Sequence, residues 1–260
     1  MSTTPNGTVF SFVHDDNAKC IAAYKKLTAT YGQSDTKTAD VIVAIGGDGF
    51  MLQALNTYAA KGKRVFGMNR GTVGFLLNDY RVTGLPDRID QAIPIKLRRL
   101  KLTAQTIYGK SHVASAINEV ALFRQSAQSA NIKVTVDDIE RLPKLVCDGV
   151  LVATPAGSTA YNLSAQGPII PLMANLIALT PIAAFRPRRW PGALLPRESA
   201  VCFDVLNPEK RPVSATADGQ EIRDVLSVQI ETDRRISLTA LFDSGQPLQE
   251  RMLVEQFTTV

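Results

Sequence analysis

Length, composition and charge limit the kinds of protein that this sequence can encode. The chain has 260 residues, of which 45% are hydrophobic and 20% are charged, so it can bury a sizeable core. These figures exclude a disordered protein and a disulfide-stapled mini-protein, and they fit one large domain or two smaller ones. The net charge of +5, from 29 basic and 24 acidic residues, suits phosphorylated ligands at least as well as nucleic acid.

The cysteines and the N-terminal segment favour a cytoplasmic protein. Cys20, Cys147 and Cys202 are far apart, and they form neither a C-x-x-C motif nor a cluster with histidine. A disulfide framework and a zinc site are therefore not supported, and we expect no metal-ligating residues. The opening residues MSTTPNG lack a basic region and a long apolar run, so we expect no secretory signal.

One long uncharged stretch must be distinguished from a membrane span. Residues 149–185 contain no acidic, basic or histidine side chain. A span needs about 20 mostly apolar residues in a row, whereas proline, glycine, asparagine and glutamine interrupt this stretch repeatedly. We therefore expect it to be buried in the protein, and we expect no membrane association.

The first part of the chain alternates strand and helix signals. In chain order, the sequence predicts a strand at 8–13, a helix at 18–31, a strand at 41–45, a helix at 51–60, a strand at 64–68 and a helix at 85–92. The second and third strands are continuous apolar runs, the pattern of parallel strands buried on both faces. A strand, turn, helix and strand at this spacing form a βαβ crossover. Residues 1–95 are therefore predicted to form an α/β domain with a parallel sheet.

From about residue 95 the pattern changes to short stretches that are rich in Val, Ile, Thr and Leu and alternate in polarity. Such stretches continue to residues 234–242, so we expect a β-sandwich domain over residues 96–240. Its few helices are expected at 160–165 and in part of 171–179. The tail, residues 241–260, contains the apolar segment RMLVEQF and is expected to pack back on the first domain.

The strongest local signal is the motif Gly46-Gly47-Asp48-Gly49, between a predicted strand and a predicted helix. Glycines let backbone N–H groups approach a phosphate closely, and a helix N-terminus favours an anion. A carboxylate repels a phosphate, so the aspartate in this motif needs a separate explanation. It can bind a divalent cation that bridges to the phosphates, or accept the proton of a hydroxyl during phosphoryl transfer. Spacing alone also allows a tight turn in which Asp48 caps the helix.

A second glycine-bearing loop, residues 69–76 (NRGTVGFL), follows the strand at 64–68. Loops at the carboxyl ends of neighbouring parallel strands line one crevice, so this loop is expected to face the glycine-rich turn. Arg70 is then a candidate counter-charge for a phosphate. An arginine in a loop also fits a solvated surface position.

Two acids interrupt the β-rich half where packing alone would not place them. Glu119 follows Asn118 between apolar pieces of sequence, and Asp148 precedes the apolar run GVLVA. Buried acids need partners, and sugar hydroxyls are suitable because each can donate a hydrogen bond to a carboxylate. An alternative in which each acid caps a turn or pairs with Arg124 or Arg141 is equally compatible with the sequence.

A third feature is the run at 154–168, TPAGSTAYNLSAQGP. Its small side chains would let a flat base approach the backbone, and Tyr161, Asn162 and Ser164 can supply polar contacts. A serine-nucleophile hydrolase is disfavoured because the chain has no G-x-S-x-G elbow. The two histidines, at positions 14 and 112, also lack a Ser/His/Asp context.

Together these motifs resemble the NAD kinase family in its bacterial form. In order, the chain carries GGDG at 46–49, NRGTVGFL at 69–76, NE at 118–119, the run at 154–168 and ADGQ at 217–220. GGDG alone is shared with diacylglycerol, sphingosine and 6-phosphofructo kinases, so the combination carries the resemblance. One segment, residues 184–190, departs from the His- and Ser-rich stretch of many relatives.

The resemblance implies a Rossmann-like domain followed by a β-sandwich domain, and transfer of the γ-phosphate of ATP to the 2′-hydroxyl of the adenosine ribose of NAD. Asp48 matches the catalytic acid that accepts the hydroxyl proton, while Gly46, Gly47 and Arg70 would lie on the phosphate-donor side. Mg²⁺ or another divalent cation would arrive with ATP, and the assembly would be a homodimer or homotetramer. The positions that match the dinucleotide pocket are Gly49, Asn118, Glu119, Asp148, Ala156, Thr159, Ala160, Tyr161, Asn162, Ser164, Ala183 and Gln220.

Three other functions fit part of the pattern. Another small-molecule or lipid kinase with GGDG predicts an apolar acceptor groove, for which Asn118, Glu119 and Asp148 are poorly suited. A non-catalytic dinucleotide-binding sensor on the same fold is disfavoured by the intact Asp48. Nucleic-acid binding is disfavoured because only 7% of residues are aromatic and no recognised nucleic-acid motif is present.

Overall fold

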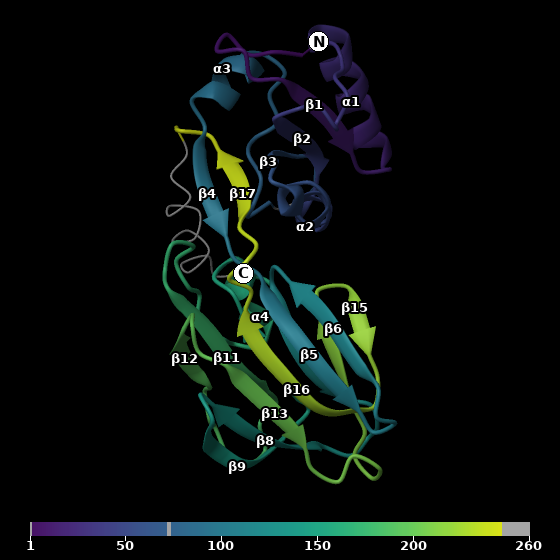
Figure 1. Cartoon of the computed structure of the whole chain (residues 1–260), viewed down its shortest axis with the longest axis vertical. Coiled ribbons are helices and arrows are strands. Elements are labelled where there is room, and N and C mark those ends of the chain that lie inside the picture. The colour runs from purple at the N-terminus through teal and green to yellow at the C-terminus, as the bar shows by residue number, and fades with distance from the viewer. Residues whose placement is uncertain (1, 72–73, 246–260) are drawn as a thin grey trace. The chain divides into compact units, whose positions relative to one another are not determined.

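The structure is a computed structural model that describes residues 2–71 and 74–245. The chain divides into two compact units (Figure 1). The first contains the residues up to Leu97 and those from Ile236 on, and the second is Arg98–Arg235. The chain therefore leaves the first unit, builds the second and returns to the first.

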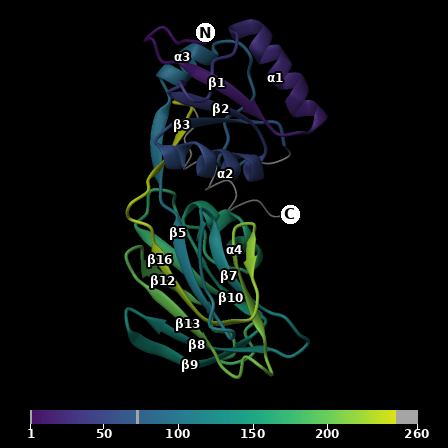
Figure 2. The same cartoon turned by 45° about the vertical axis from the view of Figure 1, so that its right-hand side comes forward.

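The first unit contains a five-stranded sheet with helices on both faces (Figure 2). The sheet order is β1-β2-β3-β17-β4, with β4 antiparallel to β17 and the other neighbours parallel. The strands are β1 (Phe10–His14), β2 (Val41–Gly46), β3 (Arg64–Asn69), β4 (Ile93–Leu97) and β17 (Leu238–Phe242). The helices are α1 (Ala18–Tyr31), α2 (Asp48–Thr57), the 3-10 helix η1 (Ala59–Lys61) and α3 (Leu85–Asp90).

Strand β2 shows why the first unit has a core on both faces of its sheet. All six of its residues are buried. Val41, Val43 and Ile45 pack in one cluster with side chains of α1 and α3, while α2 packs against β2 and β3 with its buried residues Met51 and Leu55. A strand covered on both faces needs no polar alternation, so its continuous apolar run predicts it correctly.

The second unit consists of two six-stranded antiparallel sheets that share one apolar core. In sheet order, the first sheet contains β12 (Ala193–Pro196), β11 (Leu176–Ile182), β10 (Gly149–Ala153), β7 (Glu119–Arg124), β14 (Val213–Ala217) and β15 (Gln220–Ile222). The second contains β6 (Ser111–Ala116), β5 (Leu100–Thr106), β16 (Val225–Thr232), β13 (Val201–Val205), β8 (Ala130–Val136) and β9 (Ile139–Cys147). The predicted fold class, an α/β domain followed by a β-sandwich, is confirmed.

The uncharged stretch at 149–185 lies within this second unit. It forms β10 and β11 and, between them, two short helices, the 3-10 helix η2 (Ala156–Thr159) and α4 (Tyr161–Ser164). Among the described residues, no helix combines the length and apolar character needed to cross a bilayer.

Two predictions about single segments are wrong. The sequence predicts that the strand within residues 234–242 belongs to the β-sandwich, but it is β17 and lies between β3 and β4 of the first unit. Alternating polarity indicates a strand without indicating its partner. Part of 171–179 was expected to be helical, yet a turn is followed there by the largely buried strand β11. A short apolar run fits a buried strand as well as a buried helix.

The first crossing between the units lies at Leu97, close to the expected boundary at residue 95. The second crossing lies after Arg235, ahead of the expected start of the tail at residue 241, because β17 already belongs to the first sheet. Residues 246–260 of the expected tail, including RMLVEQF, lie outside the described residues.

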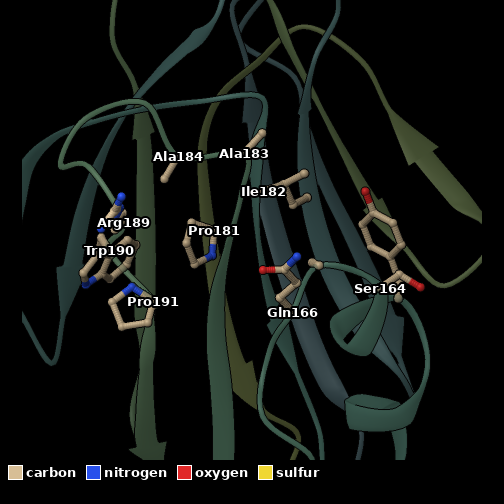
Figure 3. Close-up of a pocket in the computed structure, with 11 residues that line it drawn as sticks. Ser164, Gln166, Pro181, Ile182, Ala183, Ala184, Arg189, Trp190 and Pro191 are labelled. Atoms are coloured by element: carbon tan, nitrogen blue, oxygen red, sulfur yellow. The ribbon is translucent and has the colours of Figure 1, made fainter. Parts of the chain in front are cut away.

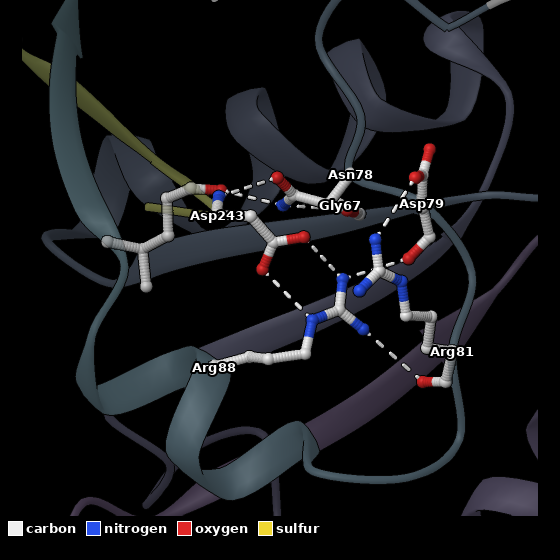
Figure 4. A network of polar contacts seen from close by, with 7 residues as sticks. Gly67, Asn78, Asp79, Arg81, Arg88 and Asp243 are labelled. Carbon is white, nitrogen blue, oxygen red and sulfur yellow. Dashed lines mark hydrogen bonds and ion pairs between the residues drawn. The ribbon is translucent and has the colours of Figure 1, made fainter. Parts of the chain in front are cut away.

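A buried asparagine ties β17 into the first sheet (Figure 4). Asn78 is 1% exposed, and its Nδ2 donates to the carbonyl oxygens of Gly67 and Leu241 at 3.1 and 2.9 Å. Its Oδ1 accepts from the Asp243 N–H at 2.9 Å. Arg88 of α3 donates from Nε and Nη2 to the two Asp243 carboxylate oxygens at 2.9 and 2.6 Å. Asn78 and Arg88, from the first part of the chain, thus hold β17 in the first sheet.

Candidate functional site

The glycine-rich motif ends β2 and begins α2. Gly46 is the last residue of β2, Gly47 is the N-cap of α2 and Asp48 is the first residue of that helix. A Cβ on Gly71 would lie 3.2 Å from the Gly47 Cα, so two loops approach here at the level of the backbone. A Cβ on Gly49 would meet nothing within 4 Å. Packing therefore does not require glycine at position 49. Close approach of a ligand is then a reason for a glycine at this position.

The Asp48 carboxylate binds the loop that follows β3. Its Oδ2 accepts from the Phe75 N–H at 2.9 Å, and its Oδ1 accepts from the Leu76 N–H at 3.1 Å. The N-cap of α2 is Gly47, so the alternative in which Asp48 caps the helix is wrong. Two amide donors fix the orientation of the carboxylate at the positive end of α2.

Arg70 belongs to the same loop, which faces the glycine-rich turn as predicted. Its N–H donates to the Gly46 carbonyl oxygen at 2.8 Å. Its guanidinium carbon lies 4.5 Å from the centroid of the Tyr80 ring. Its Nε is buried and, among the described residues, has no hydrogen-bond partner. A buried donor left unsatisfied is costly, so Arg70 is a candidate for binding an anion.

In the second unit, Asn118 and Glu119 form the corner between β6 and β7. The Asn118 carbonyl oxygen accepts from the Thr154 N–H at 2.9 Å, and the Thr154 hydroxyl donates to the Ile117 carbonyl oxygen at 2.6 Å. A Cβ on Gly157 would lie 2.2 Å from the Asn118 carbonyl oxygen. The segment after β10 thus holds the corner in place, and only glycine permits this approach at position 157.

Glu119 is a partly buried acid beside a second acid. Its Oε2 is buried and has no hydrogen-bond partner in the part of the chain that the structure describes. Burial, and after it the nearby Asp218 carboxylate, raise the pKa of Glu119 to about 7. Burial also raises the pKa of Asp218, against the opposing effect of backbone hydrogen bonds. Perturbed acids of this kind mark candidate functional sites, and a ligand hydroxyl would suit the free oxygen.

The run after β10 divides into a buried part and an exposed part. All of η2 is buried, and Asn162 is 0% exposed. The Asn162 Nδ2 donates to the carbonyl oxygens of Ser158 and Pro168 at 3.1 and 3.0 Å, and its Oδ1 accepts from the Thr180 hydroxyl at 2.7 Å. Both amide hydrogens are used inside the unit. This side chain therefore holds the loop, and its expected contact with a ligand stays a prediction.

A pocket of about 550 Å³ brings three of the predicted residues together (Figure 3). Tyr161, Ser164 and Ala183 line it. Its wall also includes Arg189 and Trp190, which lie across the pocket from Ser164 and were not predicted. Aromatic and aliphatic walls with a few polar groups are typical of cofactor sites.

Asp148 and Gln220 do not line this pocket. Asp148 pairs with Arg124 at 2.6 Å between Oδ1 and Nε, which is one of the two partners that the sequence suggested for it. Its side chain is 46% exposed, so the ion pair leaves it accessible to a ligand. Gln220 begins β15 and is exposed. Within the second unit, the predicted residues therefore fall into a corner, a pocket, the segment with Ala156, Thr159, Ala160 and Asn162, and these two separate positions.

Among the described residues, no group of three or more His, Cys, Asp or Glu side chains is placed to hold a metal ion. The three cysteines are free, with Cys20 and Cys147 buried. Burial raises the pKa of the Cys147 thiol to about 12, so this thiol is not activated for nucleophilic attack.

Sequence reasoning missed two residues that hold the corner at Asn118. Asp218 stands in the ADGQ motif after β14, where an Asp-Gly pair signals a turn but does not show what the carboxylate binds. Thr154 opens the run at 154–168, but only its tertiary contact with Ile117 reveals its role.

Comparison with protein-family models assigns both units. Residues 9–82 match the ATP-NAD kinase N-terminal domain, and residues 117–232 match the ATP-NAD kinase C-terminal domain. The first match falls within the first unit and the second within the second unit.

Curated bacterial proteins named NAD kinase are similar over nearly the whole chain. A protein from Mesorhizobium japonicum is 53% identical over 257 residues, which is 99% of each chain. One from Caulobacter vibrioides is 50% identical over 254 residues, 98% of each chain. One from Hyphomonas neptunium is 54% identical over 232 residues, 89% of this chain and 91% of that protein.

Two solved structures have a similar fold. A yeast NADH kinase complexed with NADH has a TM-score of 0.82 at 20% identity, covering 96% of this chain and 88% of that one. An NAD kinase from Archaeoglobus fulgidus in complex with ATP has a TM-score of 0.72 at 24% identity, covering 95% and 97%. Identities this low show the fold alone. The chain carries the two family domains in order, and curated relatives share about half of their residues with it. The chain therefore belongs to the ATP-NAD kinase family.

Proposed function

We propose that the chain transfers the γ-phosphate of ATP to the 2′-hydroxyl of the adenosine ribose of NAD, giving NADP and ADP. That it is an ATP-dependent NAD kinase, a phosphotransferase, follows from its family. Beyond the family activity, we propose which hydroxyl accepts the phosphate and which residues act on each substrate. The observation that carries it is the position of Asp48, an acid fixed by two backbone amides in a glycine-rich turn at the start of α2.

Asp48 is the proposed base. The 2′-oxygen attacks the γ-phosphorus, a new P–O bond forms, the bond to the bridging oxygen of ADP breaks, and Asp48 accepts the hydroxyl proton. The Phe75 and Leu76 amides hold the Asp48 carboxylate in one orientation, and an ionised carboxylate is a proton acceptor. Positioning and charge neutralisation supply most of the acceleration in a loose transition state, and the base contributes about 10²–10⁴-fold.

The first unit supplies the residues proposed for the phosphate donor. Gly46 and Gly47 keep the turn free of side chains, so that amides at the start of α2 can approach phosphate oxygens. Arg70 supplies a positive charge from the facing loop, and its buried Nε has no hydrogen-bond partner among the described residues. These groups favour negative charge on the transferred phosphoryl group.

The second unit supplies the residues proposed for the dinucleotide. Asn118 and Glu119 bind hydroxyls at the corner, where the Glu119 Oε2 has no hydrogen-bond partner among the described residues. Tyr161, Ser164 and Ala183 contact the dinucleotide in the pocket of about 550 Å³. The other positions proposed from the family resemblance are Gly49, Asp148, Ala156, Thr159, Ala160 and Gln220.

A divalent cation, Mg²⁺ or another, is proposed to arrive with ATP. The turn around Asp48 fits such a cation as part of the ATP complex, because backbone amides at the start of α2 would bind the phosphate oxygens that carry it, while Asp48 acts on the hydroxyl. Mg²⁺ prefers phosphate oxygens and water to a cage of protein ligands. When bound, it neutralises phosphate charge during transfer.

The proposed assembly is a homodimer or homotetramer in the cytoplasm. Free cysteines, two of them buried, support a reducing compartment, and the family resemblance supports the assembly. Sedimentation equilibrium of the purified chain is expected to give the mass of two or four chains. The mass of a single chain would contradict the assembly.

The role of Asp48 is tested by Asp48→Asn. We expect turnover to fall by about 10²–10⁴-fold, because the amide cannot accept the proton. The dissociation constant for NAD, measured by titration calorimetry, should stay within about twofold, since the proposed dinucleotide contacts lie on other residues. The exposed Asp16→Asn serves as the matched control and should keep full turnover. Full turnover in Asp48→Asn would exclude Asp48 as the base.

A further inference from the structure

Asp218 binds the backbone of the corner that carries Asn118 and Glu119. It lies in the turn between β14 and β15 with a left-handed φ of 47°. Its Oδ2 accepts from the Ile117 N–H at 2.7 Å, and its Oδ1 accepts from the Asn118 N–H at 3.0 Å. Its own N–H donates to the Glu119 carbonyl oxygen at 3.3 Å. One turn residue thus contacts three consecutive backbone units, and both of its carboxylate oxygens are used in doing so.

The same corner is held from its other side by Thr154. The Thr154 hydroxyl binds the Ile117 carbonyl oxygen, and the Thr154 N–H binds the Asn118 carbonyl oxygen. The peptide groups around Ile117 and Asn118 therefore have both donors and acceptors occupied. Neither side chain of the corner is used for this, so Asn118 and Glu119 keep their functional groups for a ligand.

We propose that Asp218 is a positioning residue of the dinucleotide site: its carboxylate holds the Ile117–Asn118 backbone so that the side chains of Asn118 and Glu119 meet the substrate. This inference rests on the proposed function, in which those two side chains bind NAD. Asp218 itself would not touch the reacting atoms, because its oxygens already accept the two backbone amides.

The arrangement has an electrostatic consequence at Glu119. Holding the corner with a carboxylate places a second acid beside the partly buried Glu119. Burial first, and the Asp218 charge second, raise the pKa of Glu119 to about 7. Near neutral pH, Glu119 is therefore divided between its protonated and ionised forms.

The neighbouring strands offer Glu119 no compensating charge. Beside it, β10 (GVLVA) and β14 (VSATA) contain no titratable residue. Arg124, at the other end of β7, is paired with Asp148. Asp218 is the charged group that acts on Glu119.

A sugar hydroxyl that donates to Glu119 stabilises the ionised form and so lowers its pKa in the complex. Binding of NAD near pH 7 should then release a proton. Affinity for NAD should fall as the pH drops below 7, because the protonated form must first lose its proton, and it should level off above that pH.

The test compares wild type with Asp218→Asn in three measurements. Asparagine keeps the shape of the side chain, but it can accept only one of the two amides and has no charge. We expect the KM for NAD to rise about 10-fold, the equivalent of one lost charged hydrogen bond. The value of kcat at saturating NAD should stay within about threefold, because no group at the reacting atoms changes.

The third measurement is proton release. Titration calorimetry in two buffers of different ionisation enthalpy should show about half a proton released per NAD bound by wild type at pH 7. Asp218→Asn should release less and shift the midpoint of the affinity profile to lower pH, because removal of the charge lowers the pKa of Glu119. Glu119→Gln should release none. A loss of stability alone would not move this midpoint.

The matched control is Asp224→Asn, in the turn between β15 and β16. Asp224 also has a left-handed φ, 56°, and its carboxylate has no partner among the described residues. This variant should keep the KM, the midpoint and the proton release of wild type. Thermal unfolding of each variant shows whether it is folded.

If Asp218→Asn does not fold, Asp218→Glu carries the test. It keeps the charge and changes the reach of the carboxylate, so the KM for NAD should rise while the midpoint stays in place. A wild-type KM and midpoint in a folded Asp218→Asn, or a wild-type KM in Asp218→Glu, would overturn the proposal. Failure of the proposed function is a different result: wild type would then bind no NAD and form no NADP.

Discussion

At the scale of single residues, the candidate site depends on close backbone approach as much as on functional groups. Gly157 lies against the carbonyl group of Asn118, where a Cβ would come within 2.2 Å of the oxygen. The oxygen belongs to backbone that Thr154 also holds, so it has little room to retreat. The position of Asn118 and Glu119 thus depends on the absence of a side chain at position 157 as well as on the contacts of Asp218 and Thr154.

Gly157→Ala should therefore damage the dinucleotide site. We expect the added methyl to displace the corner, raise the KM for NAD at least about 10-fold and lower the free energy of unfolding by about 2 kcal/mol, as overpacking does. Steady-state kinetics and urea unfolding measure the two effects. Gly219→Ala is the control, because a Cβ there meets nothing within 4 Å. Equal KM values for the two variants would contradict this role of Gly157.

Residue chemistry was predictable where the sequence places an unusual residue in a recognisable context. Asp48 within glycines and Glu119 within apolar sequence were both identified as candidates, and both have unusual surroundings in the structure. The contacts that Asn162 makes within the loop were not predictable, because its residue type does not show which way its amide points. Asp218 was missed for the same reason, since its carboxylate binds backbone about 100 residues away in sequence.

At the scale of secondary-structure elements, the returning strand β17 shows what a local pattern can and cannot indicate. Its alternation of polar and apolar residues predicts a strand, and it is one. Its partners, β3 and β4, are set by contacts at long range. Asn78 makes the most specific of these contacts, because it binds the carbonyl oxygens of Gly67 and Leu241 at once.

Asn78→Ala should loosen this attachment. The substitution removes the side-chain partner of the Leu241 carbonyl oxygen and of the Asp243 N–H, whereas the Gly67 carbonyl oxygen keeps the backbone N–H of residue 78. We therefore expect the free energy of unfolding to fall by about 3 kcal/mol. Urea unfolding followed by circular dichroism measures the change. Asn56→Ala, at an exposed position of α2, is the control and should leave stability nearly unchanged. A loss in Asn78→Ala no larger than in Asn56→Ala would exclude the proposed attachment.

At the scale of the whole molecule, the sequence predicted the fold class and the order of its parts. Continuous apolar strands separated by helices indicated the α/β part, and short alternating stretches indicated the β-sandwich. The route of the chain was predicted less well. The structure shows that the chain closes the first sheet only after the second unit is complete, a pairing that no local periodicity encodes.

The family assignment and the geometry of each unit converge on one reaction. The first unit holds Asp48 and Arg70, which suit phosphoryl transfer, and the second holds Asn118, Glu119 and the pocket around Tyr161, which suit a dinucleotide. The moderate net charge of +5 fits two phosphorylated substrates.

The central claim is that this chain phosphorylates the 2′-hydroxyl of NAD with ATP. The most direct measurement incubates the purified full-length chain with NAD, ATP and Mg²⁺ and detects NADP with a dehydrogenase that depends strictly on NADP. Such a dehydrogenase reports the 2′-phosphate itself. We predict NADP that accumulates in proportion to time and to the amount of protein, with one ADP released for each NADP. No NADP above a control without the protein, or release of ADP without NADP, would contradict the claim.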